Sequence, residues 1–335
     1  MPAVRRILVA VKDLRVTVRP VVRKAAQIAS ACSAQLEIYH CLSDPLVLDF
    51  AFHGAHGLEG LERTLREHAL HRLERIAVSL RQRQPGLKVT VAAEWDAPAY
   101  DAVVRRALKI KADLIVAAAH SGPRILPGLM RLTDWELVRL SPVPLLLIKN
   151  PRPYRRPAVL VAVDPAHAFS KPLRLDQALL QAGDALSRSL RGTLHAVHAY
   201  ARVPSAALSP NALPITDYGL RQVEKQAKRA AAANFDRALK GASITASRRY
   251  LIARHPVDAI LQAARKSRSA IVVMGAVSRS GLKRLLIGNT AESILDELRC
   301  DVLVVKPSHF RNRVPRAVQG PRIMMSTPAP WPGSY

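Results

Sequence analysis

The sequence predicts an α/β protein composed of two doubly wound parallel five-stranded sheets in tandem. Three observations lead to this class. The chain has 335 residues, more than an ordinary single domain, and 49% of them are apolar, enough for two cores. Its first half recurs in its second half. Within each half, short β-branched runs alternate with helical stretches, which implies right-handed crossovers between parallel strands.

The repeat consists of four segments that recur in the same order. Their separation drifts only from 152 to 158 residues, so the chain is a duplication of a domain of about 150 residues. The pairs are ILVAVKD (7–13) with VLVAVDP (159–165), LEIYHCL (36–42) with LHAVHAY (194–200), DLIVAAAHSG (113–122) with AIVVMGAVSR (270–279), and TDWELVRLSPVPLLLIKN (133–150) with TAESILDELRCDVLVVKP (290–307).

Each copy contains five apolar runs that we expect to form strands. Uninterrupted apolar runs such as AIVVMG and DVLVV indicate strands buried on both faces. Between strands, YGLRQVEKQAKRAAAANFDRAL (218–239) has its apolar residues at the 3.6-residue period of an amphipathic helix. The expected strands are 5–11, 35–41, 88–93, 113–119 and 144–149 in the first copy and 158–164, 193–200, 244–252, 270–275 and 301–306 in the second.

These patterns divide the chain into four parts. The first copy occupies residues 1–150 and the second copy residues 158–310. The proline-rich segment 151–157 between them is the expected linker. Residues 311–335 are basic and rich in proline, without an acidic residue, so we expect no packed structure there.

The net charge of +26 is the unusual feature of the composition. Such a charge attracts nucleic acid or an acidic membrane surface without a fitted site, and it also fits a simple solvated, arginine-rich surface. Aromatic residues make up only 4%, which argues against base stacking. The three cysteines form no CxxC pair, and no apolar run is long enough to span a bilayer. We therefore expect a cytoplasmic protein.

The candidate site lies where the order of strands reverses. In an open α/β sheet, ligands bind beyond the carboxyl ends of the strands at this point. With a strand order of 3-2-1-4-5, Asp164 ends the first strand of the second copy and Gly275 ends the fourth, on the two sides of the reversal. Gly288-Asn289-Thr290 then opens a helix, and helix N-termini bind phosphate. Arg279, with Lys283 and Arg284, adds positive charge.

Each of these residues also has a structural explanation. Gly275 permits a close approach of the backbone. Asn289 or Thr290 serves as a helix cap. The basic side chains belong equally well to a solvated surface. The convergence of all of them at one crevice favours an anion site.

These motifs resemble the universal stress protein family, in particular its tandem bacterial E type. Nucleotide-binding members carry Gly-x2-Gly-x9-Gly-Ser/Thr, and GAVSRSGLKRLLIGN keeps Gly275 and Gly288 at the matching separation. The resemblance covers residues 4–310, in both copies. It implies a Rossmann-like fold of the adenine nucleotide alpha hydrolase type, repeated in tandem.

The resemblance also implies an ATP or AMP site in the second copy, with Mg²⁺ present only if ATP is bound. Two positions depart from the signature, because Ser278 replaces the second glycine and Asn289 replaces the hydroxyl residue, with Thr290 one place later. The adenine and ribose pocket would be formed by Ala162, Asp164 and Ala199, and the phosphate loop by Met274, Gly275, Ser278, Gly288, Asn289 and Thr290.

The first copy has lost more of the signature. Lys12 replaces the acidic residue at the strand end, although Asp13 follows it. No signature glycine of the long spacing remains, so we expect no nucleotide in this copy. The four signature positions hold Ala118, Ser121, Arg131 and Leu132.

No pattern of a common catalytic centre occurs in the sequence. There is no Gly-x4-Gly-Lys-Ser/Thr loop, no GxSxG elbow and no HExxH pair. His40 and His198 end the second strand of each copy, where a hydrogen-bonded structural role is the expected one. His53 and His56 alone make no metal site. At most, weak ATP hydrolysis is compatible with the residues.

The resemblance, together with the absence of a catalytic pattern, implies a non-catalytic stress-response protein that binds a small ligand and acts through an unidentified protein partner. Two alternatives stay open, namely an apolar or acyl ligand in the same crevice and a polyanion on the basic surface. The fifth strands, PLLLIK and DVLVVK, have unprotected apolar edges. We expect them to pair as an internal pseudo-dimer, with a homodimer as a further possibility.

Overall fold

The structure is a computed structural model of the chain. It describes residues 4–14, 19–43, 46–48, 55–119, 133–165, 175–202, 217–276, 294–320 and 323–325. The helices and strands of the first copy are β1 (Arg6–Val11), α1 (Arg19–Cys32), β2 (Gln35–Leu42), β3 (Leu46–Leu48), α2 (Ala55–Arg83), β4 (Val89–Trp95), α3 (Ala99–Lys109), β5 (Leu114–Ala118), α4 (Thr133–Leu140) and β6 (Leu145–Ile148).

The second copy repeats this order. It contains β7 (Ala158–Val163), α5 (Leu175–Ser189), β8 (Thr193–Ala199), α6 (Asp217–Ala238), a short 3-10 helix (Ala246–Arg248), β9 (Arg249–Ile252), α7 (Pro256–Lys266), β10 (Ile271–Gly275) and β11 (Asp301–Val305). Residues 294–297 form a helical turn before β11, and β12 (Ile323–Met325) follows it.

The principal strands form one ten-stranded sheet in the order β4-β2-β1-β5-β6-β11-β10-β7-β8-β9. Each half of this order is the predicted 3-2-1-4-5, and every pairing within a half is parallel. Strand order therefore reverses at β1 in the first copy and at β7 in the second. The predicted fold class is confirmed.

The two halves join through their fifth strands. β6 and β11 pair in antiparallel orientation, with Leu146 opposite Leu303. These strands are apolar and fully buried, so pairing removes the two edges that would otherwise be exposed. The internal pseudo-dimer predicted from the sequence is present.

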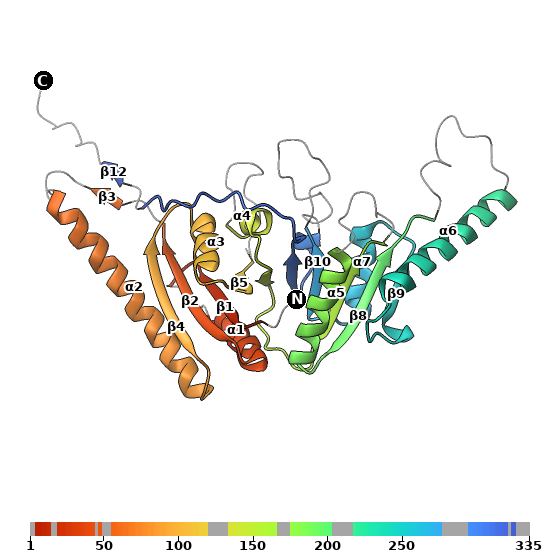
Figure 1. The fold of residues 1–335 in the computed structure, drawn as a ribbon, viewed down its shortest axis with the longest axis horizontal. Coiled ribbons are helices and arrows are strands. Elements are labelled where there is room, and N and C mark those ends of the chain that lie inside the picture. Colours follow the sequence, from red (N-terminus) through yellow and green to blue (C-terminus); the bar gives the residue numbers. More distant parts are fainter. Residues whose placement is uncertain are drawn as a thin grey trace, which may run out of the picture.

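Helices cover both faces of the sheet (Figure 1). The helices α1, α2, α5 and α6 contribute to one hydrophobic cluster, and α3, α4, α7 and the turn at 294–297 contribute to the other. Both clusters include strand residues from both copies, so each core continues through the junction between the copies. No helix in the described part of the chain is long and apolar enough to cross a membrane.

Four helices end in the same way. Ser33 follows α1 with φ 54° and Arg191 follows α5 with φ 53°, while Lys111 and Arg268 follow α3 and α7 with φ 52° and 50°. A left-handed residue after a helix lets the next backbone N–H groups bond the last carbonyls. The two copies therefore use equivalent turns at equivalent positions, although none of these residues is glycine.

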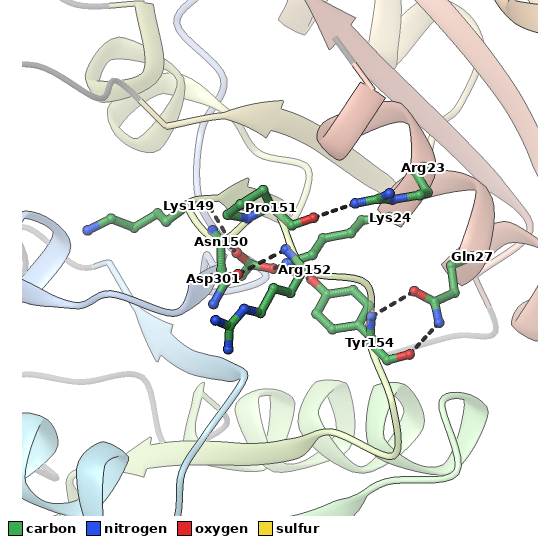
Figure 2. Close-up of polar contacts among 9 residues, drawn as sticks. All are labelled: Arg23, Lys24, Gln27, Lys149, Asn150, Pro151, Arg152, Tyr154 and Asp301. Atoms are coloured by element: carbon green, nitrogen blue, oxygen red, sulfur yellow. Dashed lines mark hydrogen bonds and ion pairs between the residues drawn. The ribbon is translucent and has the colours of Figure 1, made fainter. Parts of the chain in front are cut away.

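The linker is packed more tightly than its proline content predicts. The backbone N–H and carbonyl of Tyr154 bond the side chain of Gln27 on α1, at 3.0 and 2.6 Å (Figure 2). Arg23 of the same helix donates to the carbonyl of Pro151. The ring of Tyr154 is buried. The linker therefore fastens the two copies together at one point.

A buried carboxylate lies at the centre of this junction (Figure 2). Asp301, at the start of β11, is fully buried and accepts four hydrogen bonds. The donors are the ammonium of Lys24, the hydroxyl of Tyr154 at 2.5 Å, and the backbone N–H groups of Lys149 and Asn150 at 2.9 and 3.0 Å. Burial lowers the pKa of Lys24, an effect that the neighbouring Asp301 opposes. It raises the pKa of Tyr154 well above its usual value, and Asp301 adds to this rise.

The expectation of no packed structure after residue 310 is wrong for residues 311–320 and 323–325. This segment crosses α4 and α3 of the first copy, and β12 pairs with β3 (Figure 1). Val314 is buried. Arg105 donates to the carbonyl of Pro315 at 2.9 Å, and the N–H of Gln319 donates to Asp96 at 3.1 Å. Composition failed here because one buried valine, two hydrogen bonds between side chains and backbone, and a short strand pairing hold a segment that is rich in arginine and proline.

Candidate functional site

The predicted crevice of the second copy lies at the carboxyl ends of β7 and β10. These strands are parallel neighbours, with Val161 opposite Val273. Asp164 directly follows β7 and Gly275 ends β10, so the topology brings both residues to the same edge of the sheet. Ser278, Arg279, Gly288, Asn289 and Thr290, the other predicted loop residues, lie outside the described residues.

The two alanines of the predicted pocket lie at this edge as well. Ala162 is the penultimate residue of β7 and pairs with Val197. Ala199 ends β8 and pairs with Ile252 of β9. Both alanines are half-buried. The side chains at these two neighbouring strand ends are small and apolar, and Asp164 follows two residues after Ala162.

The structure adds an acidic residue that the sequence analysis missed. The backbone N–H of Asp164 donates to the carboxylate of Asp176, at 3.2 and 3.3 Å from its two oxygens. Asp176 is in the first turn of α5, where a carboxylate is favoured by the helix dipole. This position in the first turn of a helix is the signal by which the sequence could have revealed Asp176. The contact fixes the direction in which the chain leaves β7.

Gly275 has a packing reason to be glycine. A Cβ atom at this position would lie 2.9 Å from the Cδ2 of Leu175 and 3.6 Å from the Cδ1 of Leu179, both on α5. The absence of a side chain therefore lets α5 approach β10 closely. This supports the structural explanation and is compatible with a ligand at the same strand end.

The side chain of Met274, a residue of the predicted phosphate loop, lies in the core. It is 5% exposed and belongs to the hydrophobic cluster formed with α3, α4 and α7. It is therefore core, because successive side chains of a strand point to opposite faces of the sheet and not beyond its end.

The two histidines at the ends of the second strands make equivalent hydrogen bonds. His40 Nδ1 lies 2.8 Å from the carbonyl of Val11, and His198 Nδ1 lies 3.4 Å from the carbonyl of Val163. Both carbonyls belong to the last residue of the neighbouring first strand. This agrees with the predicted structural role of the histidines.

The first copy presents a different edge. Lys12 and Asp13 follow β1 and are exposed, and Ala118 ends β5, also exposed. Ser121, Arg131 and Leu132 lie outside the described residues, as does His53. Within the part of the chain that the structure describes, no three His, Cys, Asp or Glu residues come together as a metal site would require.

The sequence profile of the universal stress protein family matches this chain twice, at residues 3–149 and 156–306. These two matches cover most of the chain and coincide with the two copies. The chain belongs to the universal stress protein family.

Curated relatives and solved structures agree with this assignment. Universal stress protein E of Escherichia coli K12 is 27% identical over 233 residues, which are 68% of this chain and 72% of that protein. The homologue from Haemophilus influenzae is 25% identical over 225 residues, 67% of this chain and 72% of that one.

Two solved universal stress proteins share the fold along nearly the whole chain. The one from Pseudomonas aeruginosa UCBPP-PA14, described as putative, has a TM-score of 0.62 at 23% identity and covers 91% of this chain and 94% of its own. The one from Archaeoglobus fulgidus has a TM-score of 0.58 at 15% identity and covers 90% and 98%. The C-terminal segment from residue 307 onward lies outside both family matches.

Proposed function

We propose that this universal stress protein binds an adenine nucleotide in its second copy, at the edge formed by β7, β8 and β10, and acts through protein partners without catalysing a reaction. The observation that carries the proposal is the position of Asp164 and Gly275 at the two neighbouring strand ends where strand order reverses. Ligands of open α/β sheets bind at this point.

The residues at this edge suit a nucleoside. The carboxylate of Asp164 would accept hydrogen bonds from ribose hydroxyls, as acidic residues do in dinucleotide sites. Ala162 and Ala199 offer small apolar side chains to an adenine ring.

Phosphate binding rests on the sequence of residues 275–290. Gly275 and Gly288 keep the signature spacing, and Ser278, Asn289 and Thr290 carry side chains that donate hydrogen bonds. Arg279 would neutralise phosphate charge. Mg²⁺ would accompany ATP and not AMP.

We expect the first copy to bind no nucleotide. Lys12 stands where the second copy has Asp164, and Ala118 stands where it has Gly275. We therefore expect one nucleotide for each chain.

Calorimetric titration with ATP and with AMP tests the proposal. Asp164→Asn should weaken binding about tenfold, because a carboxylate hydrogen bond contributes roughly 1.5 kcal/mol. Asp13→Asn, the same change at the acidic residue next to the counterpart position Lys12 in the first copy, should leave the affinity unchanged.

Three outcomes would contradict the proposal: no heat at millimolar nucleotide, two equivalent sites, or equal effects of the two substitutions. Mass spectrometry of gently purified protein distinguishes nucleotide binding from the alternative of an apolar ligand. Such a ligand would stay bound through purification, would be detected by its mass, and would block nucleotide binding.

A further inference from the structure

A groove of about 820 Å³ lies on the first copy, away from the proposed nucleotide site. Its walls come from four parts of the chain: Arg66 of α2, the end of β4, the helix α3, and residues 312–318 of the C-terminal segment. This volume falls within the range of small-molecule sites.

Apolar side chains form much of the groove. Leu108 and Val318 are 41% and 63% exposed, and they are two of the four large apolar side chains that the described residues leave exposed. Such side chains gathered in one hollow indicate a binding site more than scattered ones do. The apolar lining consists of Trp95, Leu108, Val314, Pro315 and Val318.

Five basic and two acidic side chains surround this apolar surface. Two of the basic residues already form ion pairs with the acidic residues of the groove. Arg105 holds Asp96 at 2.8 and 2.6 Å, and Arg106 holds Glu94 at 2.7 Å. These contacts neutralise both acids of the groove.

The other three cations are exposed, and of these Lys109 makes one long ion pair, with Glu94. Arg66 donates its Nε to the carbonyl of Ala93, and no ion pair is shown for its guanidinium within the described chain. Arg316 is exposed and likewise has no ion pair with a described residue. The Lys109 side chain is 70% exposed, with its Nζ 3.6 Å from Glu94. The groove therefore brings three exposed cations together with exposed apolar side chains.

We propose that this groove binds an organic anion that carries a single acidic group on an apolar body. The apolar lining would take the aliphatic or aromatic part, and Arg66, Lys109 and Arg316 would take the carboxylate or sulfonate. The presence of exposed positive charge and apolar surface in one groove determines this class.

The C-terminal segment builds the groove. Val314 is buried, and the hydrogen bonds of Arg105 to Pro315 and of Gln319 to Asp96 fix the segment against α3 and β4. Because this segment lies outside the two family matches, the groove is a property of this chain and does not follow from the repeated domain.

Titration of the full chain with the fluorescent sulfonate 1-anilinonaphthalene-8-sulfonate tests the proposal. Its emission should rise on binding, with one molecule for each chain and energy transfer from Trp95. Dodecanoate should displace it at least ten times more effectively than dodecanol, because only the former carries the charge.

Matched variants locate the site. Arg66→Gln combined with Arg316→Gln should weaken binding at least tenfold. Arg75→Gln combined with Arg313→Gln, on the same helix and the same segment but outside the groove, should not. Leu108→Ser should weaken binding, while Val78→Ser, at a residue that is 43% exposed elsewhere, should have no effect.

The proposal is overturned if the sulfonate does not bind, if groove and control variants behave alike, or if dodecanol competes as well as dodecanoate. It is also overturned if ATP displaces the sulfonate or Asp164→Asn weakens its binding, since the site would then be the nucleotide crevice. A failure of nucleotide binding itself would leave these results unchanged.

Discussion

Lys149 and Lys306 follow the fifth strands of the two copies at equivalent positions, yet their surroundings have opposite charge. Lys149 donates to the carbonyls of Leu295 and Asp296, at 2.5 and 3.4 Å. Burial lowers its pKa, and nearby acidic groups that include Asp296 oppose that effect. Burial, together with the nearby charge of Arg139, lowers the pKa of Lys306 to about 8.

One exchange of charge contributes to this contrast, beside the effects of Cys300, Asp134 and Asp301 on Lys149. The aligned segments place Arg139 of the first copy where the second copy has Asp296. Each lysine faces the helix of the other copy because β6 and β11 run antiparallel, so Lys149 meets an acid and Lys306 meets a base.

The starts of the fifth strands differ as well. Asp301 has Pro144 as its counterpart in the aligned segments. Asp301 accepts four hydrogen bonds from the first copy and the linker, while Pro144 has no side-chain group to offer. The duplication thus preserved the fold, and the junction between the copies became asymmetric through a few polar residues.

Asp301→Asn should cause the largest loss of stability among the changes at this asymmetric junction. It leaves the ammonium of Lys24 buried without a carboxylate, a change that costs about 3–5 kcal/mol of unfolding free energy. Urea denaturation measures the loss. Glu67→Gln, at an exposed carboxylate on α2, should stay within about 0.5 kcal/mol of the parent protein. A loss below about 1 kcal/mol for Asp301→Asn would show that the junction is held by the apolar strands alone.

Gly192→Ala tests a second difference between the copies. Gly192 and Ala34 follow the left-handed residues Arg191 and Ser33 and make the same backbone bond, to Ser187 at 2.7 Å and to Ala29 at 2.8 Å. A Cβ at Gly192 would lie 2.0 Å from the carbonyl oxygen of Pro157.

The linker residue Pro157 is the reason for this glycine. Because its backbone must move to admit a Cβ, we expect Gly192→Ala to cost about 1–3 kcal/mol. The reverse change, Ala34→Gly, should cost only about 0.5–1 kcal/mol through chain entropy. Thermal unfolding of both variants measures the two losses, and equal values would contradict a role for the linker contact.

The smallest expected effect is the change of folding stability with pH that the titration of Lys306 causes. Its pKa in the folded chain, about 8, lies below the 10.5 of an unperturbed lysine. Between these values the unfolded chain binds more protons, so stability should rise as the pH rises from 8 to 10.5. The Phe310 ring, 4.8 Å from the ammonium, partly offsets this by favouring the charged form.

Lys306→Met should remove this rise and increase the urea midpoint at pH 7. Lys149→Met should lower the midpoint at the same pH, because the carbonyl of Leu295 loses its donor. Denaturation curves at a series of pH values measure both changes. If the two variants shift in the same direction, the exchange of Arg139 and Asp296 does not control the junction.

Most of the fold followed from the sequence because the repeat and the apolar runs are strong signals. Strand ends agree with the expected ranges to within about two residues, except in 244–252, where only Arg249–Ile252 is a strand. The short strands β3 and β12 were missed. Their pairing joins residues 46–48 to 323–325, and three-residue strands so far apart have no periodicity to find.

The candidate site was predictable only in part. The placement of Asp164 and Gly275 at one edge followed from topology. The burial of the Met274 side chain could not be predicted, because it depends on which face of β10 the side chain occupies. Asp176 and the groove beside Leu108 were missed, since each depends on a contact between segments that no local pattern records.

The sequence by itself determined the duplication, the strand order of each copy and the apolar fifth strands, because these depend on local periodicity and on rules of chain connection. Only the tertiary structure decided how the copies differ. The four donors on Asp301, the surroundings of Lys149 and Lys306, and the path of residues 307–320 over the first copy are set by long-range packing. The energy of a buried polar group depends on the hydrogen-bond and charge partners around it, and here those partners are distant in the chain.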